Sequence, residues 1–217
     1  KLFRNKKNLG LVENYNKAFK YSSGDFFSWI GAHDLYHKDY FKTLINKLLS
    51  NSSNSLVFSN ITKINKDNKI MLKKKNTGFQ LLSKNIIIRN LLMPFYIKGS
   101  GDMVCGIFRS KDLNKTNLFS KKVLNPDYLL ITQIVNLGPI TKVELPLRSR
   151  RDFREDEIQF SKWSDKYINL KNRYIKNNGD VSYLLKNFPT LIMFLNIIKE
   201  IFLRNRFYNP YFLLISL

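Results

Sequence analysis

Apolar residues recur every three or four positions in two segments near the start of the chain, 11–21 and 39–49. Side chains at this spacing lie on one face of a helix. Ser22, Ser23 and Gly24 follow the first segment and favour the end of a helix. The polar stretch SNSSNS closes the second segment. The pattern therefore predicts two amphipathic helices.

Short, nearly continuous apolar runs alternate with the helical segments. Runs of this length are typical of strands that are buried on both faces. The runs that fit are FFSWIGA (26–32), SLVFSNITKI (55–64), MVCGIF (103–108) and ITKVEL (140–145). The polar stretch NKDNK follows the second run and predicts a turn.

Two further segments have a helical period. The segment 81–93 is followed by Pro94, which we expect to stop a helix. Pro126 suits the first turn of a helix that runs to Leu137, and Gly138 suits its C-terminal cap. Strands that alternate with helices of about ten residues or more indicate an α/β fold with a mixed, mostly parallel sheet flanked by helices.

Beyond Pro146 the alternation of strands and helices gives way to a basic cluster and then to helical patterns. A basic cluster comes first, consisting of Arg148, Arg150, Arg151 and Arg154. A polar helical pattern follows over 155–177, and an apolar one begins at Val181. We therefore predict an α/β core over 1–147 and a helical C-terminal extension over 148–217.

The chain is strongly basic, with 37 Lys and Arg residues against 16 Asp and Glu residues and a formal net charge of +21. Such a charge favours a polyanionic neighbour: nucleic acid, an anionic membrane surface or a phosphorylated substrate. Lys, Asn and Ile are abundant together, as codon bias in an AT-rich genome would produce. We therefore interpret much of the charge as solvated surface.

The cysteine content and the first residues of the chain indicate its cellular compartment and whether a longer protein precedes it. The single Cys105 excludes an internal disulfide framework and a zinc site with several cysteines. A cytoplasmic location is the simplest interpretation. The chain has no initiator Met and no visible secretion signal, so we expect it to start within a longer protein.

The strongest local group of polar residues is His33 and Asp34, which end the run FFSWIGA just before a helix. Ligands of open α/β sheets bind beyond the carboxyl ends of strands. A carboxylate there suits a hard divalent cation that carries phosphates. The alternatives are that Asp34 caps a helix or closes the strand by an Asx turn, and that His33 makes a structural hydrogen bond.

These residues lie in a longer run, NLGLVENYNKAFKYSSGDFFSWIGAHDLYHKDYFKTLINKL, which resembles the middle of a family 2 glycosyltransferase with the GT-A fold. The matching positions are Asn8, Gly10, Asn16, Ala18, Gly24, Asp25, His33, Asp34 and Tyr40. The segments GIFRSKDL and NPDYLLITQIVNLGPITKVELPLRSRR resemble the acceptor-side region of the same family. The resemblance extends over about residues 5 to 150.

The resemblance implies transfer of a sugar from a nucleotide-sugar donor to a hydroxyl group of a glycan or lipid-linked acceptor, with inversion, in polysaccharide or glycan biosynthesis. It implies a divalent cation, Mn²⁺ or Mg²⁺, at Asp34, with His33 as a second candidate ligand. It implies that Asp127 is the catalytic base, whereas the alternative is a first-turn acid that favours the helix dipole. Asn16 and Gly101 would contact the substrate or its nucleotide.

The sequence departs from the family pattern at three places. Ala32 and His33 stand where further Asp residues are common, and Tyr15 stands where Arg is frequent. The opening strands of the family, which hold the nucleotide base and ribose, have no counterpart before Lys1. We therefore expect the chain alone to be inactive.

Two other functions remain open at this stage. A basic nucleic-acid-binding module is indicated by charged and aromatic residues at Lys166, Tyr167, Lys171, Arg173 and Tyr174, although a helix face with extended lysines is the preferred interpretation. The apolar segment within 189–217 is too short to span a bilayer, and the arginines that flank it suit peripheral contact at the inner face of the membrane.

Overall fold

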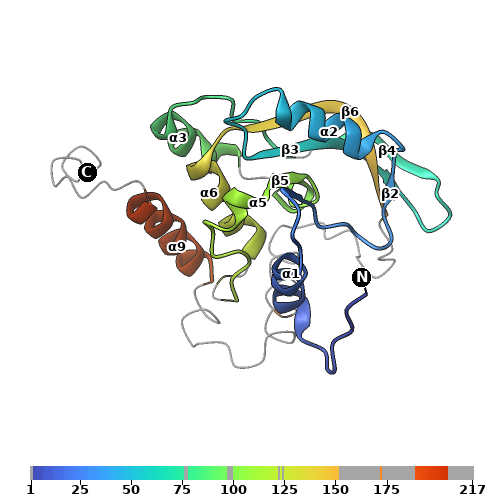
Figure 1. Cartoon of the computed structure of the whole chain (residues 1–217), viewed down its shortest axis with the longest axis horizontal. Coiled ribbons are helices and arrows are strands. Elements are labelled where there is room, and N and C mark those ends of the chain that lie inside the picture. The colour runs from blue at the N-terminus through green and yellow to red at the C-terminus, as the bar shows by residue number, and fades with distance from the viewer. Residues whose placement is uncertain are drawn as a thin grey trace.

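The computed structural model describes residues 2–75, 78–96, 100–121, 123, 125–151, 172 and 189–204 (Figure 1). The helices are α1 (Gly10–Lys20), α2 (Tyr40–Leu49), α3 (Ile86–Tyr96), α4 (Ser100–Met103), α5 (Ser110–Leu113), α6 (Pro126–Leu137) and α9 (Pro189–Arg204). The strands are β1 (Phe26–Phe27), β2 (Leu35–Tyr36), β3 (Leu56–Ile64), β4 (Ile70–Lys75), β5 (Ile107–Arg109) and β6 (Ile140–Arg151). The predicted polar helix over 155–177 lies outside the described residues, apart from position 172.

The strands form one mixed sheet in the order β1-β5-β3-β6-β2, with β4 paired to β3. The predicted α/β class is therefore confirmed. The expectation of a mostly parallel sheet is wrong for the described strands, because only β3 and β6 pair in parallel. For β4 the reason is local: it follows β3 through a short turn at Asn65–Lys69, and a connection this short can only form a hairpin.

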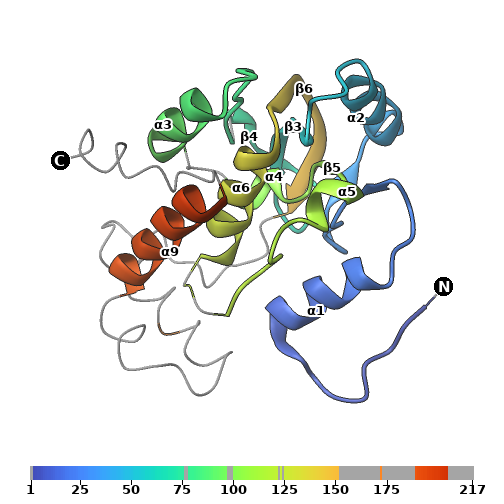
Figure 2. The same ribbon diagram turned by 60° about the vertical axis from the view of Figure 1, so that its left-hand side comes forward.

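Alternating side chains of the central strands divide the core into two clusters. On β3, Leu56 and Phe58 belong to the larger cluster, whereas Val57 between them belongs to the smaller one. Successive side chains of a strand point to opposite faces, so the clusters lie on opposite sides of the sheet. Figures 1 and 2 show α2 on one side and α1 and α6 on the other.

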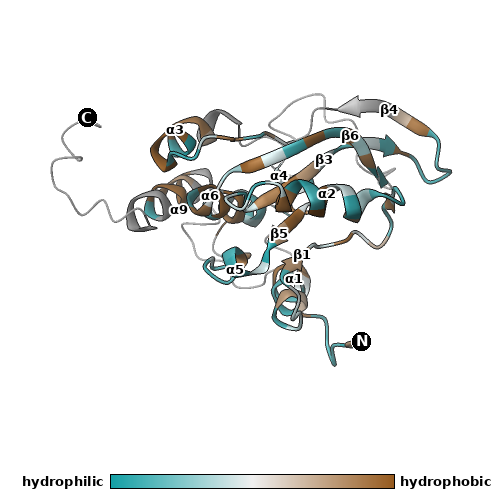
Figure 3. Cartoon of the chain, turned by 45° about the horizontal axis from the view of Figure 1, so that its top comes forward, coloured by the Kyte–Doolittle hydropathy of each residue, from teal (hydrophilic) through white to brown (hydrophobic). Residues whose placement is uncertain are grey.

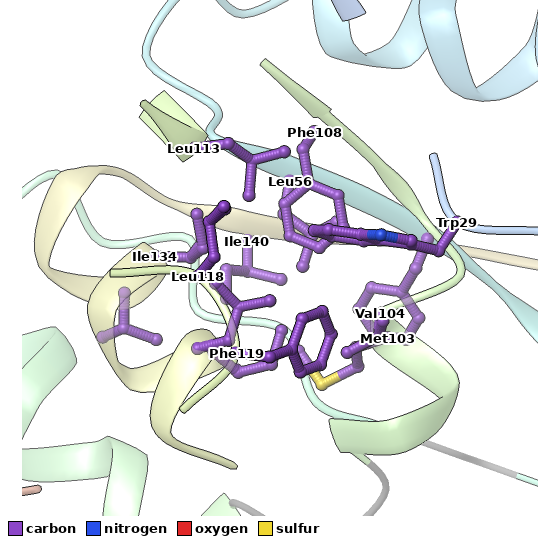
Figure 4. Close-up of a cluster of buried hydrophobic side chains, with 14 of the residues drawn as sticks. Trp29, Leu56, Met103, Val104, Phe108, Leu113, Leu118, Phe119, Ile134 and Ile140 are labelled. Carbon is purple, nitrogen blue, oxygen red and sulfur yellow. The ribbon is translucent and has the colours of Figure 1, made fainter. Parts of the chain in front are cut away.

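The larger cluster fills the space between the sheet and the helices α1, α4 and α6. Trp29 belongs to this cluster (Figure 4) and makes edge-to-face contacts with Phe27, Phe108 and Phe119. Its indole N–H donates to the backbone oxygen of Tyr15 on α1, 3.0 Å away. This single side chain therefore joins α1 to the sheet.

The run FFSWIGA is less regular than its composition predicts. Only Phe26 and Phe27 form a strand, and the chain turns between Gly31 and Asp34. The run MVCGIF differs too, because α4 ends at Met103 and the strand begins at Ile107. Burial is as predicted for MVCGIF, whereas in FFSWIGA only Trp29 is buried and Ile30 is 54% exposed. Composition did not determine the hydrogen-bonding partners of either run.

The helix predicted over 81–93 begins and ends later than expected. Leu81 exchanges backbone hydrogen bonds with Ile140, so it belongs beside the sheet. Asn85 accepts a hydrogen bond from the backbone N–H of Ile87 at 2.8 Å, which favours a helix start at this point. The helix then continues past Pro94 to Tyr96, so the expectation that Pro94 stops it is wrong.

The predicted helix 126–137 is confirmed as α6, with Pro126 in its first turn. Gly138 ends it with a φ of −175°, an extended conformation that any residue adopts. A glycine is needed for another reason. A Cβ at this position would lie 2.4 Å from the backbone oxygen of Ser53.

The last strand continues beyond the boundary predicted after residue 147. β6 runs to Arg151, so Arg148, Arg150 and Arg151 belong to the sheet. The helix α9 then packs against α6, where Ile197 contacts the larger core cluster. Figure 3 shows apolar residues on α3, α6 and α9. No helix within the described ranges is long and apolar enough to cross a membrane.

Neighbouring leucines on α2 provide a matched test of this packing. Leu48 is 0% exposed in the smaller cluster, whereas Leu49 is 56% exposed. We expect Leu48→Ala to lower the free energy of unfolding by about 2–5 kcal/mol because it leaves a cavity. The same change at Leu49 should cost less than about 0.5 kcal/mol. Denaturant titration measures both, and equal losses would contradict the register of α2.

Candidate active site

Asp34 lies in a tight turn that connects β1 to β2. Its backbone N–H donates to the oxygen of Gly31 at 3.1 Å, and the N–H of Gly31 donates to the hydroxyl oxygen of Tyr36 at 3.2 Å. A Cβ at Gly31 would lie 2.9 Å from Oδ2 of Asp34. The glycine therefore leaves room for the carboxylate to fold back into the turn.

The carboxylate of Asp34 is held by the last strand. Its Oδ1 accepts a hydrogen bond from the backbone N–H of Arg151 at 3.1 Å, and its Oδ2 lies 3.8 Å from Nε of Arg148. The helix α2 begins six residues later, after Asp39. Asp34 is therefore not a helix cap. Its carboxylate joins the turn to β6, because β2 pairs antiparallel with that strand.

A divalent cation at Asp34 stays a prediction. The 3.8 Å separation from Arg148 is too long for a hydrogen bond, and the side chain of Asp34 is 6% exposed. Carboxylate oxygen is the donor that Mg²⁺ and Mn²⁺ prefer. The described residues contain no group of three or more His, Cys, Asp or Glu that could hold a metal ion. A cation there therefore needs most of its ligands from a phosphate and water.

His33 is adjacent to Asp34 in the turn, and its side chain is exposed. Its backbone oxygen accepts a hydrogen bond from Nε of Arg151 at 3.0 Å. That contact fixes the backbone of the turn. The role of His33 as a metal ligand stays a prediction.

Asp127 lies in the first turn of α6, half-buried against α4. Its Oδ2 accepts a hydrogen bond from the hydroxyl of Ser100 at 2.7 Å. Burial raises the pKa of the Asp127 carboxyl; the Ser100 hydrogen bond opposes this effect and the charge of Asp102 adds to it. A carboxylate with a raised pKa is a better proton acceptor near neutral pH than an ordinary aspartate.

Gly101 lies directly beside this carboxylate. A Cβ on Gly101 would be 3.4 Å from Oδ2 of Asp127, so the glycine keeps that oxygen approachable. Gly101 belongs to the short helix α4, Ser100–Met103. The proximity of Gly101 to Asp127 agrees with a place at the acceptor, and direct contact with a substrate stays a prediction.

Asn16 has a different environment from the one the resemblance implies. Its amide N–H donates to the backbone oxygen of Phe119 at 2.9 Å, and its oxygen accepts from the backbone N–H of Phe119 at 3.0 Å. Both ends of the amide are used to attach α1 to the loop before α6. A contact of Asn16 with the nucleotide stays a prediction that these hydrogen bonds do not support.

Three charged residues to which sequence analysis assigned no role, Arg148, Arg150 and Asp102, lie between Asp34 and Asp127. Arg148 is 2% exposed and donates through Nη2 to Oδ1 of Asp102. Arg150 donates through Nη1 to both carboxylate oxygens of Asp102, at 2.9 Å each. The spacing of the two arginines was the available signal, because residues two apart on a strand share a face.

Two tyrosines and a cysteine line the same region. The hydroxyl of Tyr40 donates to the backbone oxygen of Cys105. Burial raises the pKa of Tyr36 to about 12 and raises the pKa of the Cys105 thiol. Both groups are therefore neutral at physiological pH. They act here as hydrogen-bonding and packing groups rather than as charges.

A cavity of about 680 Å³ lies elsewhere in the described part of the chain, bordered by Lys20, Asp25, Arg109 and Lys111 among others. Neither Asp34 nor Asp127 lines it. The site is therefore defined by its polar contacts and not by an enclosed pocket. The residues that suggested a nucleic-acid-binding module, Lys166 to Tyr174, lie outside the described residues.

The comparisons with known proteins identify the family. The model of glycosyl transferase family 2 matches residues 1–117, which is more than half of the 217 residues. The chain therefore belongs to this family, as the sequence predicted. A search of curated proteins found no match.

Solved structures of TarS from S. aureus are similar to this chain. A crystal structure of TarS 1-349 in complex with UDP-GlcNAc is 16% identical with a TM-score of 0.48, and the alignment covers 82% of this chain and 50% of that one. A second structure of TarS 1-349 is 13% identical with a TM-score of 0.48, covering 89% and 69%. This chain spans about half the length of the first structure.

Proposed function

We propose that the protein transfers a sugar from a nucleotide-sugar donor to a hydroxyl group of a glycan or lipid-linked acceptor, with inversion, in polysaccharide or glycan biosynthesis. Membership of glycosyl transferase family 2 supports the transfer of a sugar. The observation that carries the chemistry is the half-buried carboxylate of Asp127, which Ser100 orients and Gly101 leaves approachable. That arrangement suits a base better than a solvated acid.

In this proposal Asp127 accepts the proton of the acceptor hydroxyl. The hydroxyl oxygen attacks the anomeric carbon on the face opposite the leaving group and forms the new glycosidic bond. The bond from the anomeric carbon to the diphosphate breaks, and its electron pair leaves with the nucleoside diphosphate. Attack from the opposite face inverts the anomeric configuration.

On the donor side, Asp34 would hold a divalent cation through Oδ2, with His33 beside it. When bound, such a cation supplies positive charge to the leaving diphosphate. The contribution of the chain is to keep the carboxylate in place, through the N–H of Arg151 and the room that Gly31 provides. Arg150 is 35% exposed and adds positive charge near the same face.

The test is product formation by the full-length protein. It would be incubated with Mg²⁺ or Mn²⁺, a panel of nucleotide sugars that includes UDP-GlcNAc, and hydroxyl acceptors. Release of nucleoside diphosphate that depends on the acceptor supports the proposal, and NMR of the product reads the anomeric configuration. Retention of configuration would reject the role of Asp127 while leaving sugar transfer intact.

The hydrogen bond from Ser100 to Asp127 predicts a shift in pH dependence. This bond lowers the pKa of Asp127 against the effect of burial, so Ser100→Ala should raise it further. Because the base must be ionised, the acidic limb of the kcat profile should move to higher pH.

Steady-state rates between pH 5 and 9 provide the measurement. Ser110→Ala is the matched control, because the hydroxyl of Ser110 donates to the backbone oxygen of Gly24 and not to a carboxylate. Its profile should equal that of the wild type. An acidic limb that stays in place in Ser100→Ala, or moves to lower pH, would argue against Asp127 as the titrating group.

A further inference from the structure

A single buried arginine contacts carboxylates from two separate parts of the candidate site. Arg148 on β6 is 2% exposed. Its Nη2 donates to Asp102 on α4, and its Nε lies 3.8 Å from Oδ2 of Asp34 in the turn after β1. A buried guanidinium is tolerated only where carboxylates compensate its charge. Arg148 and the two aspartates therefore form one charge-compensated unit.

This unit reaches the proposed base through α4. Asp102 and Ser100 belong to the same four-residue helix, and the hydroxyl of Ser100 donates to Asp127 at 2.7 Å. A helix of one turn moves as a unit, so a shift of Asp102 also shifts Ser100. The contacts run from Asp34 through Arg148 and Asp102 to Ser100 and Asp127.

We propose that Arg148 is a positioning residue that couples the donor-side carboxylate Asp34 to the acceptor-side base Asp127. This inference rests on the proposed function. Arg148 is too deeply buried to touch a substrate itself, so it acts through the two aspartates. Arg150 supports the unit from its outer side, with both oxygens of Asp102 at 2.9 Å.

The geometry requires arginine rather than lysine. The guanidinium presents Nε and Nη2 on one rigid plane, directed at different carboxylates. A lysine ammonium is a single point charge on a flexible stem and cannot hold both partners at these positions. Buried ion pairs also add little net stability compared with apolar residues of the same size. An apolar residue at position 148 could not hold the carboxylates of Asp34 and Asp102 at a fixed distance from each other.

The first test is Arg148→Lys in the full-length protein, with Arg89→Lys as the matched control. Arg89 is 3% exposed, like Arg148, but it donates to backbone oxygens of Ser83, Lys84 and Val135. Both changes keep the charge and should lower the melting temperature. Only Arg148→Lys should lower kcat, by about 10- to 100-fold, because misplaced catalytic groups cost about that much. It should also raise the donor KM, because Asp34 is displaced.

The second test does not depend on activity. Asp34→Asn should shift the backbone amide resonances of Ser100 and Asp127 in NMR spectra, although neither residue touches Asp34. In the Arg148→Lys background the same substitution should leave those resonances in place. If Arg148→Lys does not fold, Asp102→Asn replaces it in both tests, with the same expected results.

The outcomes separate this inference from the proposed function. Kinetic constants of Arg148→Lys that equal those of Arg89→Lys, in a protein that transfers sugar, would overturn the coupling alone. Amide shifts that persist without Arg148 would also overturn it. A wild-type protein that transfers no sugar but shows the Arg148-dependent shifts would reject the proposed function and retain the coupling.

Discussion

Asp127→Asn in the full-length protein should slow sugar transfer by roughly two to four orders of magnitude, the usual contribution of a positioned base. Donor affinity should remain nearly unchanged, because the proposed role of the residue is to act on the acceptor and because asparagine has the same shape. Asparagine can still accept the hydrogen bond from Ser100, so the local structure should be retained. Steady-state transfer and calorimetric donor binding measure the two effects separately.

Stability gives an independent check on this variant. Burial raises the pKa of Asp127, so the folded state favours the protonated carboxyl. Below the pKa that Asp127 has in the unfolded chain, its protonated carboxyl stabilises the folded state. This stabilisation is lost as the pH rises through the higher pKa of the folded state. At neutral pH the ionised carboxylate is therefore unfavourable, and Asp127→Asn should melt at a temperature no lower than the wild type.

The matched control for Asp127→Asn is the same change at Asp67, an exposed residue in the turn between β3 and β4. Asp67→Asn should leave both turnover and donor affinity unchanged. Normal turnover in Asp127→Asn would refute the base assignment. A large loss of donor affinity in that variant would instead place Asp127 on the donor side.

Asp34→Ala should weaken metal-dependent donor binding by at least about 10- to 100-fold, the range seen for groups that only support metal ligands. The lost carboxylate removes the proposed direct ligand and also releases Arg148 and the N–H of Arg151. Calorimetric titration of donor in Mn²⁺, and again in excess chelator, isolates the metal-dependent part.

Asp39→Ala is the control for this experiment, because Asp39 is half exposed and pairs with His37, 3.6 Å away. Its metal dependence should equal that of the wild type. His33→Ala then tests the second candidate ligand. If Asp34→Ala keeps a normal response to metal, the ligand role moves to His33 or to another residue.

Local patterns in the sequence were sufficient for much of the fold. The helical periods of 11–21 and 39–49 and the apolar run of 55–64 correspond to α1, α2 and β3 within a residue or two. Each depends on burial of one face or both faces, which the order of apolar residues reveals directly. Pro126 marked the start of α6 for a different reason, because its ring favours the first helical turn.

Contacts between distant residues could not be predicted in this way. The pairing of Arg148 with Asp102 joins positions 46 residues apart, and Arg151 contacts Asp34 across 117 residues. The sequence placed Asp127 correctly in the first turn of a helix, whereas Asp34 does not end the predicted strand, because β1 stops at Phe27 and Asp34 directly precedes β2. Nothing local indicated that the buried Arg148 lies beside Asp34 and contacts α4. The short helix α4 escaped detection because a single turn leaves no period.

The most direct test of the central claim is whether the full-length protein releases nucleoside diphosphate from a nucleotide sugar while a hydroxyl acceptor gains that sugar. Mass spectrometry of the acceptor and chromatography of the nucleotide follow both products in one reaction. The account predicts equal amounts of glycosylated acceptor and nucleoside diphosphate from the wild type, and at least about 100-fold less of both from Asp127→Asn. Product formation at the same rate in the two proteins would contradict it.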